Sequence, residues 1–97
     1  MRRRVRGAPY GPGPTTQQEG ADAHHVFPQK FADKFREIGI NIHDPRFGAW
    51  WETRAHQRMG FAYNARWEKF LSEGHSAEEI LRFGRKISAD YGLSIGF

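Results

Sequence analysis

The chain contains no cysteine, and this absence excludes disulfide bonds and thiolate metal sites. A bound metal ion would have to be held by histidine, carboxylate, amide oxygen or water. The redox compartment of the protein cannot be read from the sequence either, because no thiol or disulfide reports it.

Long apolar segments are also missing. No apolar run approaches the roughly 20 residues that a membrane-spanning helix needs. The basic stretch at residues 1–6 is followed by Gly, Pro and Gln instead of an apolar segment, which argues against a secretory signal peptide. We therefore expect this chain itself to make no contact with a membrane.

Acidic residues are outnumbered by basic ones. The sequence has 15 Lys and Arg against 11 Asp and Glu, a formal net charge of +4 and a pI near 9.9. This balance favours an acidic partner such as nucleic acid.

The length of 97 residues suffices for one domain. Residues 1–20 are rich first in Arg, then in Gly and Pro, then in polar side chains, so they have little to bury. We predict a disordered basic linker there and a folded domain at residues 21–97. The arginines of the linker form either a solvated tail or a sequence-independent phosphate contact. They are Arg2, Arg3, Arg4 and Arg6.

The first part of the domain is predicted to be a short strand at residues 23–27 followed by a helix. Pro28 suits the first turn of that helix, and its apolar residues recur at spacings of one helical turn up to Gly39, which can end it. These residues are Phe27, Phe31, Phe35 and Ile38. Residues 40–43 then alternate apolar and polar side chains, and Asp44 with Pro45 marks a turn.

A second strand is predicted at residues 49–51, followed by a long helix. Thr53 can cap the start of this helix, which runs to about Ser72 or Glu73 before Gly74. One face of the helix is expected to be buried. The face carries His56, Gly60, Tyr63, Trp67 and Phe70.

The last helix is predicted to begin at Ser76, where the spacing to Glu79 is that of a capping box. Its expected inner side carries Ile80, Phe83, Ile87 and Tyr91. Gly84 weakens this helix, and residues 93–97 have the composition of an edge strand. The order of elements predicts a predominantly helical α+β fold.

His24 and His25 are adjacent, and His56 follows on the long helix. Neutral imidazole can bind a metal ion or accept a proton near pH 7, so the three histidines are candidates for both roles. Each histidine could instead have a purely structural role. His24 and His25 could form hydrogen bonds with backbone groups at the end of the strand, and His56 could be a buried core residue.

A resemblance to a known family rests on three segments. They are His-His-Val-Phe-Pro-Gln from His24, Gly-Ile-Asn-Ile-His-Asp ending at His43 and Asp44, and the helix with His56 and Tyr-Asn-Ala-Arg-Trp. Together they resemble the HNH or His-Me finger nucleases. Residues 23–97 are most similar to the C-terminal domain of the myxobacterial paralogous lipoproteins, which include swarm-inhibition toxins.

The resemblance implies a ββα-metal core with an extra helix after the first strand and a C-terminal helix. It also implies one divalent ion of the zinc or magnesium class, bound by His24 and His56, with His25 as the general base. The ion would stabilise charge on the phosphate while the imidazole deprotonates water. Asn64 or His43 would complete or orient the ligand set, although for His43 a structural or exposed role is favoured over that of a ligand.

The implied function is that of a metal-dependent endonuclease, the toxic C-terminal module of a bacterial toxin. It would be secreted or delivered into the cytoplasm of a target cell, with DNA favoured over RNA as substrate and a cognate immunity protein as partner. A lipidated cysteine of a lipoprotein parent would lie outside this cysteine-free chain.

Two positions depart from the family pattern. Phe47 falls near the place where many members carry an orienting asparagine, and Gly60 stands where many carry a second helical histidine. These departures motivate an alternative, a catalytically degraded scaffold that binds nucleic acid or protein. A third possibility is a helical module whose histidines only make hydrogen bonds.

Basic and aromatic side chains remain as candidate nucleic-acid contacts. Arg46, Arg54 and Arg58 are predicted to contact nucleic acid. Five further cations either line a phosphate-binding groove or belong to a solvated helix face. The five are Arg66, Lys69, Arg82, Arg85 and Lys86. Trp50 and Trp51 could stack on bases, but paired tryptophans in a small aromatic protein are more often core residues.

Overall fold

Two short antiparallel strands bring the beginning and the middle of the domain together. The computed structural model describes residues 20–97. In it β1 (Ala21–His25) pairs with β2 (Gly48–Glu52), with Ala21 opposite Glu52 and His25 opposite Gly48. The predicted linker, with its arginines at residues 2, 3, 4 and 6, lies outside the described residues apart from Gly20.

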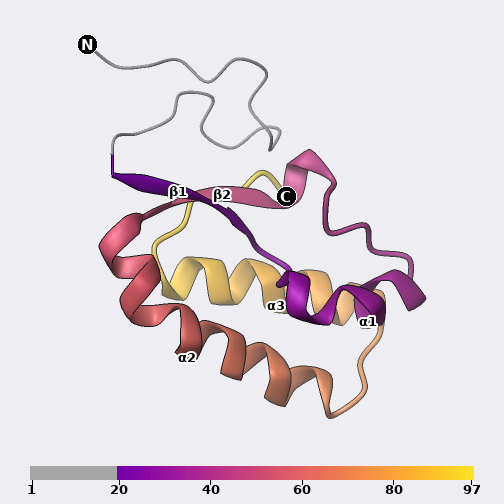
Figure 1. Cartoon of the computed structure of the whole chain (residues 1–97). Helices are drawn as coiled ribbons and strands as arrows, with labels where there is room; N and C mark the ends of the chain where they lie inside the picture. The colour runs from indigo at the N-terminus through magenta and orange to yellow at the C-terminus, as the bar shows by residue number, and fades with distance from the viewer. Residues whose placement is uncertain (1–19) are drawn as a thin grey trace.

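Within residues 20–97, three α-helices lie on one side of this strand pair (Figure 1). A 3-10 turn (η1, Gln29–Phe31) and α1 (Ala32–Glu37) follow β1, and a second turn (η2, Pro45–Phe47) leads into β2. The chain continues directly into α2 (Thr53–Leu71) and ends with α3 (Ala77–Asp90). Figure 1 shows α2 and α3 side by side in opposite directions below the strands. The predicted α+β fold, mostly helical and with a helix inserted after the first strand, is confirmed.

The first strand begins and ends two residues earlier than predicted. Val26 and Phe27 are fully buried, so neighbouring side chains no longer alternate between two faces, as they would in a strand. The Val26 amide still donates to the Phe47 carbonyl at 2.9 Å, after which the chain turns into the core.

The helix expected after Pro28 is shorter than its apolar spacing suggested, because its first turn is the 3-10 turn η1. Its predicted end is confirmed. Gly39 has a φ of +87°, a conformation that favours glycine, and the Ile40 amide donates back to the Phe35 carbonyl at 2.9 Å. Ile40 and Ile42 are then buried without forming a strand.

The start of α2 differs from the prediction by one residue. Glu52, not Thr53, caps the helix, because its carboxylate accepts hydrogen bonds from the Arg54 and Ala55 amides at 3.3 and 2.8 Å. Thr53 is the first helical residue, and its hydroxyl is free to donate elsewhere. The capping box at the start of α3 is confirmed, with Ser76 and Glu79 bonded reciprocally.

Aromatic residues are half of the buried hydrophobic residues within residues 20–97. Phe27, Phe35, Tyr63 and Trp67 are fully buried; Phe27 follows β1, Phe35 lies on α1, and the other two lie on α2. The Trp67 ring lies 5.4 Å from those of Phe27 and Phe35 in edge-to-face geometry. The predicted inner face of α2 is therefore correct.

Residues 93–97 do not form the predicted edge strand. They follow α3 as irregular chain, and Phe97 packs its ring 5.0 Å from that of Phe47. Apolar composition here serves packing, because Leu93, Ile95 and Phe97 are partly buried against the core.

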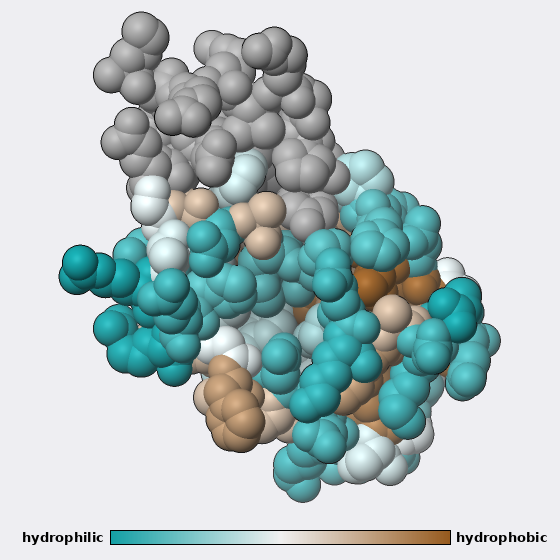
Figure 2. Space-filling view, in the orientation of Figure 1, coloured by the Kyte–Doolittle hydropathy of each residue, from teal (hydrophilic) through white to brown (hydrophobic). Residues whose placement is uncertain are grey.

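The surface is mostly polar. Hydrophilic side chains dominate the face drawn in Figure 2, with limited hydrophobic areas between them. Within residues 20–97, no helix combines the length and apolar character that spanning a membrane requires.

Candidate functional site

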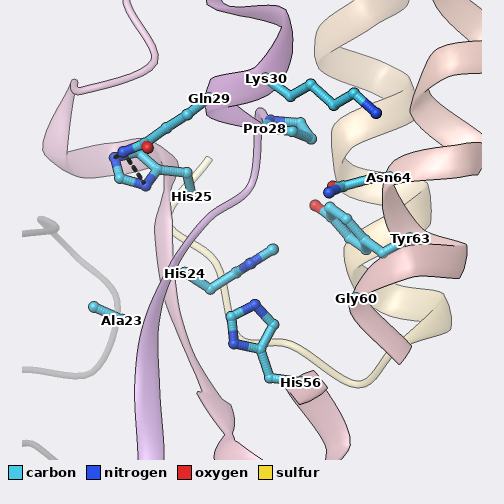
Figure 3. Close-up of a pocket in the computed structure, with 10 residues that line it drawn as sticks. All are labelled: Ala23, His24, His25, Pro28, Gln29, Lys30, His56, Gly60, Tyr63 and Asn64. Atoms are coloured by element: carbon cyan, nitrogen blue, oxygen red, sulfur yellow. Dashed lines mark hydrogen bonds between the residues drawn. The ribbon is translucent and has the colours of Figure 1, made fainter. Parts of the chain in front are cut away.

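β1 places the two adjacent histidines on opposite sides. Successive side chains of a strand alternate, and Figure 3 shows the His24 ring on one side of β1 and the His25 ring on the other. His24 is buried with 7% exposure, and its ring meets those of Trp51 and Tyr63 at 4.8 and 4.7 Å. His24 is therefore held rigidly by the core.

His56 joins His24 from the first turn of α2. The centroids of the two imidazole rings are 5.3 Å apart at an interplanar angle of 77°. The His56 ring also stacks on Trp51, with centroids 4.9 Å apart. Two residues that are distant in the sequence thus lie next to each other on one side of β1 (Figure 3).

Asp22 orients the His56 ring, a role that no pattern in the sequence indicated. The Asp22 Oδ2 atom lies 3.0 Å from His56 Nδ1, while its Oδ1 atom accepts a hydrogen bond from the Thr53 hydroxyl at 3.0 Å. The hydrogen bonds from His56 and then Thr53 lower the pKa of Asp22 below its usual value. The proton of a neutral His56 thus belongs on Nδ1, which leaves the lone pair on Nε2.

Burial keeps His24 neutral. It lowers the pKa of His24 to about 3, with smaller contributions from the nearby His56 and His25. The Nε2 atom of His24 is buried and has no hydrogen-bond partner in the described part of the chain. A buried polar atom without a partner is uncommon and costly, so this nitrogen is a candidate for binding something that the fold does not supply.

His25 lies in a different environment. Its ring faces Gln29, whose Nε2 atom is 3.4 Å from His25 Nδ1, and meets the exposed His43 at 5.2 Å in edge-to-face geometry. Burial and then the nearby His43 lower the pKa of His25, which favours the neutral form needed by a general base. The structure thus places His43 beside the candidate base and not beside His24 and His56.

His24, His25 and His56 all line one pocket of about 380 Å³. Asn64 borders it from α2, and Lys30 reaches over it from η1 toward Asn64 (Figure 3). Lys30 therefore adds a positive charge to the pocket that contains the histidines. It was not among the predicted site residues, although it lies only five residues after His25. The full lining is Ala23, His24, His25, Pro28, Gln29, Lys30, His56, Gly60, Tyr63 and Asn64.

The predicted arginines lie outside this pocket. Arg46 donates to the Asp44 carboxylate at 3.0 and 3.1 Å and lies over the Phe47 ring at 5.1 Å. Arg54 and Arg58 are exposed on α2 and form no ion pair within residues 20–97.

Most of the other predicted cations have carboxylate partners. Arg66 and Lys86 share Asp90, at 2.9 and 3.2 Å. Lys69 and Arg82 lie 3.7 and 3.8 Å from glutamates one turn away. Arg85 is exposed on α3. None of the five lines the histidine pocket.

The two departures from the family pattern differ in their surroundings. Phe47 is a core residue with 6% exposure. Gly60 lines the pocket, where an added Cβ would lie 3.7 Å from His56 Cδ2, an ordinary contact distance. A side chain could therefore stand at position 60.

The donor set suits a metal ion held by few protein ligands. Within residues 20–97 there is no cluster of three or more His, Cys, Asp or Glu residues arranged for metal binding. His24 and His56 nevertheless offer two imidazoles, and Asn64, which lines the same pocket about two helical turns beyond His56, offers an amide oxygen. The partnerless Nε2 atom of His24 is the observation that makes this set fit an ion.

Comparisons with known proteins add no assignment. The chain matches no protein-family model, and no curated protein or solved structure is significantly similar to it. A functional proposal for this chain therefore depends on its own residues and their geometry.

Proposed function

We propose that residues 21–97 form a metal-dependent endonuclease that hydrolyses phosphodiester bonds, with DNA favoured over RNA. The observation that carries this proposal is the pairing of His24 and His56 at 5.3 Å between ring centroids in one pocket. Two imidazoles bound to one tetrahedral ion place their centroids roughly 5 Å apart, so the spacing suits a shared ion.

His24 and His56 would hold the ion with Asn64 or water completing the ligand set. A divalent ion there would stabilise negative charge on the phosphate and leaving-group oxygens. Imidazole nitrogens suit zinc and similar transition metals better than magnesium, so this donor set favours the zinc class.

His25 would accept the proton of the attacking water. Its lowered pKa supports this role, because the ring is already neutral near pH 7. Since His24 and His25 face opposite sides of β1 and both border the pocket, the phosphate would bind across the end of the strand. Lys30, which lines the same pocket, would contact a phosphate oxygen.

The wider biological setting is proposed from the sequence resemblance alone. It comprises a toxic C-terminal module delivered into a bacterial target cell and an immunity protein that covers its active face. Basic charge supports the nucleic-acid partner.

A cleavage assay with matched variants tests the proposal. Plasmid DNA and RNA are incubated with the purified chain in EDTA and with added zinc, manganese, nickel or magnesium. We expect ion-dependent cleavage that His25→Ala reduces by about 10²- to 10⁴-fold. His24→Ala and His56→Ala should raise the ion concentration that is required.

His75→Gln is the control, because His75 lies between Glu73 and Glu79, away from the pocket. Cleavage should be unchanged in this variant. An absence of cleavage with every ion, or a His25→Ala variant as active as the original chain, would exclude the proposal.

The buried position of Phe47 favours a second candidate, a nucleic-acid-binding domain without hydrolysis. A phenyl ring in the core cannot orient the base by hydrogen bonding. Salt-sensitive binding of DNA without metal uptake, measured by calorimetry, would support this candidate instead.

A further inference from the structure

Phe61 is the most exposed large hydrophobic residue among residues 20–97. Its exposure is 87%, whereas Met59, the other exposed one, reaches 37%. Most phenyl rings of the described domain make ring contacts in the core, but none is present for Phe61. A phenyl ring left in water gains nothing for folding, so its position calls for a different explanation.

The neighbours of Phe61 on α2 are polar or cationic. Arg58 and Gln57 precede it by three and four residues, and both are exposed on the same side of the helix. Arg54 lies one turn before Arg58. We call Arg54, Gln57, Arg58 and Phe61 the outer α2 face.

The arginines of the outer α2 face have no ion-pair partner within residues 20–97. Between Thr53 and Trp67 the helix contains no Asp or Glu. Arg66, farther along α2, is neutralised by Asp90, but Arg54 and Arg58 have no ion-pair partner in the part of the chain that the structure describes. Two unpaired guanidinium groups beside an exposed ring form a surface suited to an anionic aromatic ligand.

The outer α2 face borders the histidine pocket. Gly60 and Asn64 line the pocket, and they stand one residue before and three residues after Phe61. From Arg54 to Phe61 the helix axis rises roughly 10 Å, about the length of three stacked nucleotides. A strand lying on this face would therefore enter the pocket at its α2 rim.

We propose that the outer α2 face binds an unpaired nucleic-acid strand, with Phe61 stacked on a base and Arg54 and Arg58 on phosphates to one side of that base. This inference rests on the proposed nuclease function and specifies its substrate as single-stranded or locally unpaired. Bases within a duplex already stack on their neighbours, so insertion of a ring there costs unstacking, whereas an unpaired base stacks freely.

Fluorescence anisotropy with labelled oligonucleotides in EDTA tests the binding without cleavage. Loss of one base-stacking contact should weaken binding of a single strand by about 5- to 150-fold in Phe61→Ala, with a much smaller effect on a duplex. Phe61→Trp should restore binding, and its indole emission should change when the strand is added. Met59→Ala is the matched control and should bind as the original chain does.

Replacement of the arginines should change the salt dependence of binding, because they contact phosphates. The logarithm of the single-strand binding constant falls linearly with the logarithm of the salt concentration. Arg54→Gln and Arg58→Gln should each make the slope of this line shallower by about 0.7. Lys34→Gln, at an exposed position on α1, should leave the slope unchanged.

Equal single-strand affinity for Phe61→Ala and the original chain would overturn the inference and leave the ring as a contact for a protein partner. A preference for duplex over single strand would overturn it as well. Failure of the nuclease proposal is separate: binding that depends on Phe61, without ion-dependent cleavage, would remove hydrolysis and retain this surface.

Discussion

The Oδ2 atom of Asp22 lies 3.0 Å from the Nδ1 atom of His56, which links the start of β1 to the first turn of α2. Both side chains are partly exposed, at 40% and 32%. Because Nδ1 is bonded to the carboxylate, the other ring nitrogen of His56, Nε2, points toward His24 (Figure 3). Asp22 acts on the candidate ion site through His56.

Replacement of Asp22 should weaken ion binding without unfolding the domain. In Asp22→Asn the amide cannot support the basicity of His56 as a carboxylate does, so we expect zinc affinity to fall by about 10- to 100-fold. Isothermal titration calorimetry measures this affinity. Asp33→Asn, which affects only an exposed pair with Arg36, should bind zinc unchanged; equal affinities in both variants would contradict an orienting role for Asp22.

Burial of His24 should make the protein less stable in mild acid. The pKa is about 3 in the folded protein and near 6.5 in the unfolded chain, so only the unfolded chain binds the proton between these values. The free energy of unfolding should therefore decrease as pH falls below 6.5, by up to about 1.4 kcal/mol per pH unit from this group.

Urea denaturation in EDTA from about pH 7 to pH 5 measures the effect. His24→Gln should show a shallower pH dependence than the original chain, because it lacks the group that protonates on unfolding. His25 contributes in the same direction, since its pKa is also lowered, and so some dependence should remain. Identical slopes for the two proteins would show that His24 is not held neutral by the fold.

His43 should influence the titration of His25. Its proximity lowers the pKa of His25, although burial is the larger cause, so His43→Ala should raise this pKa toward its ordinary value. NMR titration of the imidazole protons in the metal-free protein gives the midpoint of His25 in the original chain and in His43→Ala. His75→Gln serves as the reference, and a His25 midpoint that does not move in His43→Ala would show that the ring contact has no electrostatic effect.

The two helical glycines Gly84 and Gly60 should respond in opposite ways to alanine. At Gly84 an added Cβ would lie 3.1 Å from Phe27 and 3.3 Å from Phe97, and Phe27 is fully buried and cannot yield easily. We expect Gly84→Ala to destabilise the fold by about 1–3 kcal/mol, despite the better helix propensity of alanine.

Gly60→Ala provides the contrast, because its Cβ would meet only His56 at an ordinary 3.7 Å. The helix should gain up to about 1 kcal/mol there. Chemical denaturation of both variants at neutral pH compares them. Similar stabilisation at the two positions would mean that the core around Phe27 relaxes more readily than its packing indicates.

Local patterns in the sequence were sufficient for much of the fold. The capping box at Ser76, the glycine end at Gly39 and the buried face of α2 were all correctly predicted, because each depends on residues within one or two helical turns. The bounds of β1 and the N-cap of α2 were wrong. Both depend on competing contacts, the burial of Val26 and the capping carboxylate of Glu52, which spacing alone does not reveal.

The sequence by itself determined the order of helices and strands, the buried faces of the helices and the set of candidate histidines. Only the tertiary structure decided that His24 meets His56, that His25 faces away beside His43, and that Lys30 reaches the pocket. Periodicity reports which side of an element is apolar. It carries no information on how β1 docks against α2, and that docking creates the contacts between residues distant in the chain.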